Sequence, residues 1–131
     1  MFEKKVRVYY EDTDAGGIVY HSNYLNFMER CRCDWLEFLG FNIASIQQND
    51  GIVFVVREAN LKFDRPARLF DKLVVTLQPL QVGKVKLLLD QKIYNEGELL
   101  CQAQIKLATL HHTSFKLTAM PADLQNAMAV S

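Results

Sequence analysis

The stretch "SNYLNFMERCRCDWLEFLG", residues 22–40, sets the architecture of this chain, because apolar side chains recur in it three and four positions apart. This spacing is that of one face of an α-helix, and the side chains on that face are Tyr24, Phe27, Met28, Cys31, Trp35, Phe38 and Leu39. Ser22 or Asn23 can cap the start, and Gly40 stands where a helix commonly ends. The pattern predicts a helix from about residue 22 to residue 39, with an apolar stripe that belongs in a core.

The chain on both sides of this helix has the pattern of β-strands. Residues 3–10 alternate apolar and polar side chains, which is typical of a half-buried strand. Four more strands are predicted at 52–63, 72–80, 84–94 and 99–112. The last three are separated only by short segments that contain glycine, so we expect them to form antiparallel hairpins. A short helix begun by Pro121 is predicted near the end.

These elements predict a single domain of the α+β class over residues 1–131. One helix cannot cover both faces of a five-stranded sheet, so the sheet is expected to lie against the helix on one side only. The other face or edge is then available to a second copy of the chain, which predicts a homo-oligomer.

The composition limits what the chain can bind and where it works. Its 15 Lys and Arg residues equal its 15 Asp and Glu residues, so no field of one sign favours nucleic acid. The start lacks the apolar run of a signal peptide, and no stretch approaches the roughly 20 apolar residues of a membrane span. The three cysteines are an odd number, and Cys31 and Cys33 lie on different faces of the predicted helix. Reduced thiols predict a cytoplasmic protein.

An acidic loop with two glycines, "YYEDTDAGGIVYH" (residues 9–21), leads into the helix. Unpaired backbone N–H groups at a helix N-terminus can polarise a carbonyl, as an oxyanion hole does. Gly16 and Gly17 let the backbone approach a ligand closely. A carboxylate beside such N–H groups is suited to acyl hydrolysis. The loop can equally be a solvated one in which Asp12 and Asp14 only form turns.

The segment "YYEDTDAGGIVYHSNYLNFMERCR" resembles the active-site segment of the 4-hydroxybenzoyl-CoA thioesterase family of hotdog-fold proteins. The family pattern, roughly D-x-x-G-x-V/I-x-x-x-N-Y, is matched at Asp14, Gly17, Val19, Asn23 and Tyr24. Similarity is greatest to the YbgC-type branch of acyl-CoA thioesterases, which is associated with the bacterial Tol–Pal system. The likeness continues through "ERCRCDWLEFLG", "FVVREANLKFDRPARLFDKLVV" and "ATL".

The resemblance implies a fold, a reaction and an assembly. A curved antiparallel β-sheet wraps around one long central α-helix, which is the hotdog fold. Two subunits join their sheets edge to edge, with active sites at the dimer interface, and two dimers can form a homotetramer. The reaction is hydrolysis of an acyl-CoA thioester, with acyl carrier protein as the other possible carrier of the acyl group.

The resemblance also assigns roles within the loop. Asp14 is the catalytic carboxylate, either the general base for water or the nucleophile. The backbone N–H that polarises the thioester carbonyl falls at His21, whose imidazole need not take part. Tyr10 leads into the same loop and is a candidate to orient water or substrate.

Coenzyme A carries phosphates, which a protein of zero net charge must bind with local cations. Arg65 and Arg68 flank Pro66 at a bend between two strands, and Lys84 and Lys86 begin the next hairpin strand. Either pair can supply phosphate contacts, or these four can be ordinary surface charges.

Two other functions fit the same residues. A hotdog dehydratase would pair a histidine with a carboxylate, as His21 and Asp14 could do. A non-catalytic subunit would bind an acyl thioester, or dock acyl carrier protein, without turnover. No metal or other cofactor is expected, because His111 and His112 should point to opposite faces of a strand and no cysteine pair has zinc spacing.

Overall fold

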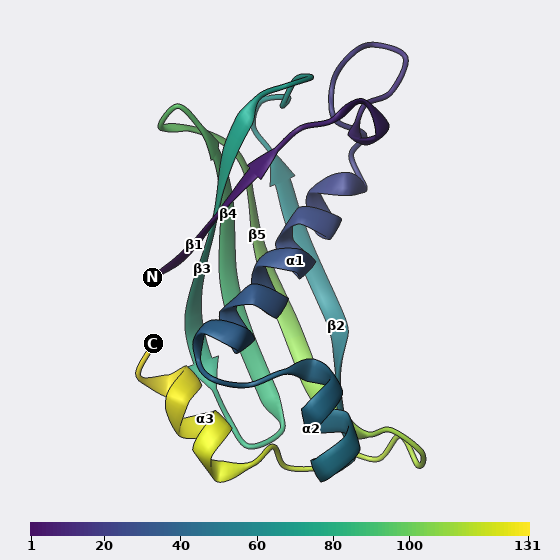
Figure 1. The fold of residues 1–131 in the computed structure, drawn as a ribbon, viewed down its shortest axis with the longest axis vertical. Helices are drawn as coiled ribbons and strands as arrows, with labels where there is room; N and C mark the ends of the chain where they lie inside the picture. Colours follow the sequence, from purple (N-terminus) through teal and green to yellow (C-terminus); the bar gives the residue numbers. More distant parts are fainter.

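The computed structural model describes residues 1–131 as one curved antiparallel sheet with a long helix packed on one face (Figure 1). The strands are β1 (Phe2–Arg7), β2 (Ile52–Phe63), β3 (Lys72–Val82), β4 (Lys86–Asn95) and β5 (Glu98–His111). Their order in the sheet is β1-β3-β4-β5-β2, and every neighbouring pair is antiparallel. The predicted α+β class, the hairpins β3–β4–β5 and the sheet around one helix are therefore confirmed.

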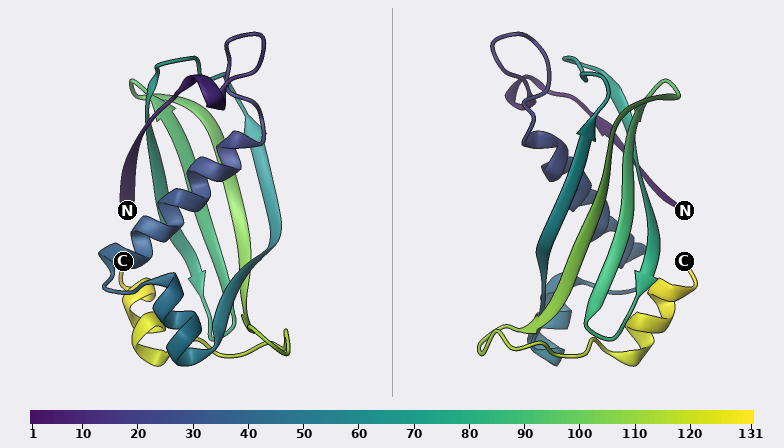
Figure 2. Two further views of the ribbon diagram at one scale, coloured as in Figure 1. Left: turned by 45° about the vertical axis from the view of Figure 1, so that its right-hand side comes forward. Right: turned by 180° about the vertical axis from the view of Figure 1, so that it is seen from behind.

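The long helix is α1 (Asn23–Phe38), and its apolar face forms the centre of the core. Phe27, Met28 and Cys31 are completely buried against strand residues such as Val75 and Ile105. Burying one large apolar side chain contributes about 1.5–3 kcal/mol, so this stripe is a major source of stability. The stripe explains why the helix lies across the concave face of the sheet (Figure 2).

The apolar face predicted for this helix is wrong at the C-terminal end of α1. Phe38 is 73% exposed, and Leu36 is the residue that is buried there. The reason is the oblique path of α1, whose last turn reaches the edge strand β1 rather than the middle of the sheet (Figure 1). Phe38 contacts Phe2 of β1 instead, with ring centroids 5.5 Å apart.

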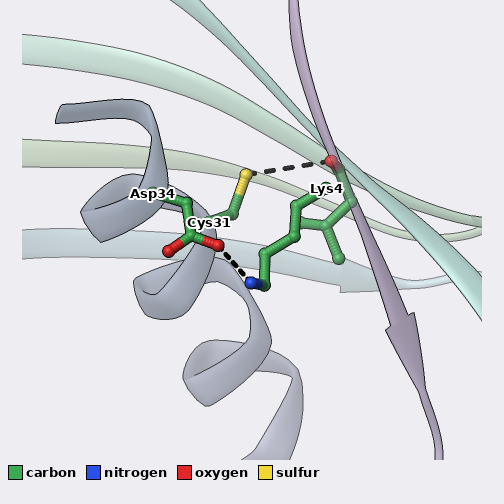
Figure 3. A network of polar contacts seen from close by, with 4 residues as sticks. Lys4, Cys31 and Asp34 are labelled. Atoms are coloured by element: carbon green, nitrogen blue, oxygen red, sulfur yellow. Dashed lines mark hydrogen bonds and ion pairs between the residues drawn. The ribbon is translucent and has the colours of Figure 1, made fainter. Parts of the chain in front are cut away.

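Strand β1 is joined to α1 by polar contacts as well. Lys4 of β1 forms an ion pair with Asp34 of α1, and beside this pair the buried Cys31 thiol of α1 lies 3.8 Å from the carbonyl oxygen of Val75 on the neighbouring strand β3 (Figure 3). Lys4 and Asp34 are both partly exposed, so solvent screens their attraction. Their pairing therefore orients the edge strand more than it stabilises the fold.

Two shorter helices close the end of the sheet that lies furthest from the start of α1 (Figure 1). The predicted terminal helix is present as α3 (Ala122–Ala129), directly after Pro121. Helix α2 (Ile43–Asp50) was not predicted, because only Ile46 of its eight residues is buried and no periodic stripe marks it. None of the three helices is both long and apolar enough to cross a lipid bilayer.

The two edges of the sheet differ. The edge strand β1 has 6 residues and carries three basic side chains, whereas the edge strand β2 has 12 residues. One side of β2 pairs with β5, and its other side is free of any partner strand. Long free edges present unpaired N–H and C=O groups, so β2 is the edge at which a second chain can pair.

Candidate active site

The acidic loop begins with a short 3-10 turn, η1 (Tyr10–Asp12), which ends the first strand earlier than the predicted residue 10. Asp12 is 7% exposed, and its carboxylate accepts the N–H of Tyr9 at 2.9 Å. The Asn23 side chain donates to the carbonyl oxygen of Asp12 at 3.1 Å. Asp12 therefore fixes the loop to the first residue of α1.

Asp14 lies at the tip of the loop and is exposed to solvent. Its Oδ1 accepts the N–H of Gly16 at 2.8 Å, and its carbonyl oxygen accepts the N–H of Gly17 at 3.1 Å. Gly17 has φ +78°, a conformation that favours glycine. The turn holds the carboxylate in one place and leaves Oδ2 without a protein partner.

The loop is attached to the connection that follows β2. The N–H of Val19 donates to the carbonyl oxygen of Ala67 at 2.8 Å, and Ile18 forms a bridge with Arg68. The N–H of Ala67 in turn donates to the Tyr24 hydroxyl on α1 at 3.0 Å. Burial raises the pKa of Tyr24, so this hydroxyl stays protonated at neutral pH. Loop, connection and helix are thus joined in one hydrogen-bonded unit.

The start of α1 has no side-chain cap, contrary to the prediction for Ser22 or Asn23. The Asn23 amide nitrogen donates to Asp12 instead, and its Oδ1 accepts from the Asn26 side chain at 3.1 Å. His21 precedes the helix, and its backbone N–H donates to no atom of the chain. Its exposed imidazole lies edge-on to the Tyr20 ring, with centroids 4.4 Å apart. An unpaired N–H is therefore available at the helix mouth.

The other predicted site residues differ in how they lie relative to the acidic loop and in whether they already have a charged partner. Tyr10 is 79% exposed beside the loop. Arg68 lies next to the loop through its bridge to Ile18, and no carboxylate is within 4 Å of its guanidinium. Arg65 pairs with Glu98 at 3.2 Å.

Lys84 and Lys86 lie at the β3–β4 turn, at the end of the sheet opposite the loop (Figure 1). The chain therefore brings Arg68 to the acidic loop and leaves the two lysines away from it.

A cavity of about 270 Å³ lies between α1 and the sheet. It is lined mainly by apolar side chains, namely Trp35, Leu36, Ile43, Phe54, Val56, Leu87, Leu89, Leu107 and Met128, together with Cys33, Glu29 and Arg32. Val56 of the free edge strand is 49% exposed, so the cavity adjoins that edge. Arg32 has no signal in the sequence, because its partner Gln91 is 59 positions away and no local pattern marks the pair.

The cavity and the acidic loop occupy different parts of one chain. The cavity adjoins the later turns of α1 and the first half of β2, at Phe54 and Val56. The loop adjoins the start of α1 and the connection that follows the end of β2. Two copies that pair their β2 edges antiparallel would bring these two regions together, because the end of one strand then lies beside the start of the other.

Neither the cysteines nor the histidines form an evident second site. Burial raises the pKa of Cys31 and of Cys101 to about 12, so neither thiol is a ready nucleophile. The expected opposite orientation of His111 and His112 is wrong, because their rings stack with centroids 4.9 Å apart. His111 is the last residue of β5 and His112 begins a turn, so the alternation of a strand ends between them.

The known proteins that resemble this chain are thioesterases. The model of the thioesterase-like superfamily matches residues 8–128. The acyl-CoA thioesterase YbgC of Haemophilus influenzae is 35% identical over 126 residues, which cover 96% of this chain and 93% of that protein.

Solved structures extend the likeness to the fold. A probable thioesterase from Bartonella henselae superposes with TM-score 0.87 at 30% identity, covering 91% of this chain and 98% of that one. A 1,4-dihydroxy-2-naphthoyl-CoA thioesterase from Synechocystis gives TM-score 0.90 at 25% identity, covering 98% and 95%. The acidic loop, the central helix and the sheet around it are therefore those of a hotdog-fold protein, and the chain belongs to the thioesterase-like superfamily, alongside the YbgC-type acyl-CoA thioesterases.

Proposed function

We propose that this protein hydrolyses acyl-CoA thioesters, with Asp14 as the catalytic carboxylate. The observation that carries the proposal is the position of Asp14, whose carboxylate is held by a glycine turn beside the uncapped start of α1. The relatives named as acyl-CoA thioesterases support the choice of reaction.

The chemistry requires a nucleophile and a place for the charge on oxygen. Water attacks the thioester carbonyl carbon as Asp14 takes a proton from it, the C–S bond breaks, and the proton passes to the leaving thiolate. In the alternative route Asp14 itself attacks the carbonyl carbon and the thiolate leaves. Water then hydrolyses the resulting anhydride, which frees Asp14 and the acid and supplies the proton that the thiolate takes up. The N–H at His21 donates to the carbonyl oxygen in both routes. Tyr10, which is exposed beside the loop, is the candidate to orient water or substrate.

The phosphates of coenzyme A require cations close to the acid. Arg68 meets this need best, because it is next to the loop and has no carboxylate partner. Arg65 is partly neutralised by Glu98. Lys84 and Lys86 could reach a substrate only through a neighbouring subunit, given their place at the far end of the sheet. Acyl carrier protein would present a phosphate-linked thioester to the same region.

The proposed active unit is a dimer joined along β2. Antiparallel pairing of the two free edges places the Asp14 loop of one copy beside the cavity of the other. The cavity then receives the acyl group. An apolar cavity of about 150 Å³ can hold benzene, so a cavity of about 270 Å³ has room for a substituted aromatic ring or an aliphatic chain of similar volume.

Thiol release from short aliphatic, long aliphatic and aromatic acyl-CoAs tests this function. Asp14→Asn keeps an oxygen for the Gly16 N–H, so the variant should fold normally while turnover falls about 10²–10⁴-fold. Glu11→Gln is the matched control, because Glu11 is an exposed acid in the same loop and should retain wild-type turnover. Full activity of Asp14→Asn would exclude Asp14 from the reaction. Acyl-CoA binding without turnover by the wild type would instead indicate a binding subunit.

A further inference from the structure

The cavity between α1 and the sheet has an outer end and an inner end. In the sheet order β2-β5-β4, its lining residues extend from Val56 on the free edge strand, through Leu107 of β5, to Leu89 of β4. Val56 is half-exposed, whereas Leu89 is completely buried. An acyl chain that enters from the free edge therefore moves inward across β5 toward β4.

The terminal helix α3 closes the inner end. It packs against β3, which is the next strand after β4 in the sheet, and it lies on the β3 side of the molecule while α2 lies on the β2 side (Figure 1). Met128 of α3 lines the cavity and is completely buried. Met128 is therefore the side chain that a chain entering from the β2 edge reaches last.

The backbone that carries Met128 is held in place. Leu124 of the same helix is completely buried, and before the helix the N–H of Met120 donates to the carbonyl oxygen of Lys84 at 2.9 Å. The other walls of the cavity belong to α1, α2 and the sheet, so Met128 is the one lining residue from α3. A methionine side chain is unbranched and adapts to the space around it. The size of this side chain, on a fixed helix, therefore sets the depth of the cavity.

The volume of the cavity limits how much of an acyl chain it can hold. Benzene fits an apolar cavity of about 150 Å³, so a cavity of about 270 Å³ holds roughly ten carbon atoms. Each methylene that is buried in such a cavity strengthens binding by about 4-fold. A longer chain would have to displace Met128 or leave its end in water, and it would gain nothing from its additional methylenes.

We propose that Met128 sets the upper limit on the length of the acyl chain, so that straight chains that extend as far as Met128 are the preferred substrates. The inference rests on the proposed thioesterase function, and it adds a residue that determines substrate length. Met128 acts in binding and takes no part in breaking the thioester.

A series of saturated acyl-CoAs with even chain lengths, from butanoyl-CoA to hexadecanoyl-CoA, tests the proposal. For the wild type we expect kcat/KM to rise by up to about 4-fold per methylene until the chain reaches Met128, and then to rise no further. Met128→Ala truncates the side chain and makes room for about two or three more carbons. The limit should therefore move to a chain two carbons longer, with kcat/KM about 10-fold higher for that substrate relative to the next shorter one.

Met120→Ala is the matched control, because it makes the same truncation at a buried methionine that does not line the cavity, and it should keep the wild-type limit. Met128→Phe, which is bulkier, should move the limit to shorter chains and covers the case in which Met128→Ala does not fold. A wild-type profile that rises steadily to hexadecanoyl-CoA would overturn the proposal. So would a limit that stays the same in the Met128 variants, or one that Met120→Ala moves equally.

Binding distinguishes failure of this inference from failure of the thioesterase function. Calorimetric titration compares Asp14→Asn, whose cavity is unchanged, with Asp14→Asn combined with Met128→Ala. The added substitution should improve the affinity for the first acyl-CoA beyond the wild-type limit about 10-fold relative to the acyl-CoA at the limit. This shift is expected even if no acyl-CoA is hydrolysed. The same order of affinities in both proteins would overturn the role of Met128 whatever the turnover, and no binding of any acyl-CoA would overturn both proposals.

Discussion

Two acids in the same loop have opposite surroundings. Asp12 is buried, and its carboxylate and carbonyl oxygens are used by Tyr9, Tyr20 and Asn23. Asp14 is exposed, with one carboxylate oxygen free. The first is therefore committed to structure, and the second is available for chemistry.

Removal of the Asp12 side chain should destabilise the protein. In Asp12→Ala the Tyr9 N–H loses its acceptor, and we expect a loss of about 1–3 kcal/mol in the free energy of unfolding. Urea denaturation measures this loss, with Glu11→Ala as the exposed control at nearly wild-type stability. A stable Asp12→Ala protein would show that the loop is held by its backbone bonds alone.

The three thiols should react at very different rates. Cys31 and Cys101 are completely buried and their pKa values are raised to about 12, so iodoacetamide should leave both unmodified in the folded protein at pH 8. Cys33 is partly exposed and should be modified first, although its own pKa is also raised by burial. Because the raised pKa favours the neutral thiol, the rate at Cys33 should increase with pH.

Mass spectrometry of the native and urea-unfolded protein identifies the modified cysteines. All three should react after unfolding. Modification of Cys31 before Cys33 in the folded protein would contradict the burial described above.

At the level of single residues, the sequence predicted the part of the site whose residues lie close together along the chain. The acid, the glycine turn and the helix start are within 15 positions of one another, so a motif can describe them. The Arg32–Gln91 pair depends on β4 passing under α1, and the Lys4–Asp34 pair depends on β1 doing so. Contacts between distant segments leave no trace in local spacing.

Among the secondary-structure elements, α2 depends on its ends rather than on its buried face. The side chain of Asn42 accepts the N–H of Ser45 at 3.2 Å, and Gly51 ends the helix with φ +69°. A Cβ at Gly51 would lie 3.0 Å from His111 Nε2. The helix therefore has a strong start signal and a position at its end that strongly favours glycine.

Loss of the cap should weaken α2. Asn42→Ala removes the acceptor for Ser45 and should reduce the free energy of unfolding by about 1 kcal/mol. Asn49→Ala is the control, because Asn49 is exposed within the same helix and should be neutral or slightly stabilising. Urea denaturation of both variants, compared with the wild type, checks the difference.

The elements that the sequence predicted are those with a sustained period. The apolar stripe of α1 and the alternation in β2 to β5 each extend over ten residues or more. Helix α2 has eight residues and one buried side chain, so its cap at Asn42 and the glycine at its end were the available signals. The sequence did not predict where β1 ends or where the buried face of α1 ends. Both depend on the curvature of the whole sheet, which no single segment determines.

At the scale of the whole molecule, the free β2 edge predicts where the active unit forms. If the acid and the cavity of one site come from different chains, two inactive variants should complement each other. Asp14→Asn lacks the acid, and Cys33→Phe fills the cavity. Co-expression should restore about a quarter of wild-type turnover, because half of the randomly formed dimers contain one intact site of two.

Sedimentation velocity establishes that the mixed protein is dimeric, and each variant expressed alone is the control. Mixed dimers without activity would show that the acid and the cavity of the same chain act together. A monomeric wild type with full turnover would exclude the interface along β2.

The connection after β2 has one more consequence, for how the enzyme responds to dilution. The backbone at Ala67 and Arg68 lies in the connection after the strand at the proposed interface and also holds the Asp14 loop, while Tyr24 links both to α1. Separation of the subunits would thus remove the neighbouring cavity and loosen the loop in the same event. Specific activity should then fall steeply below the dissociation constant of the dimer, so that the cellular abundance of the protein itself sets its turnover per molecule.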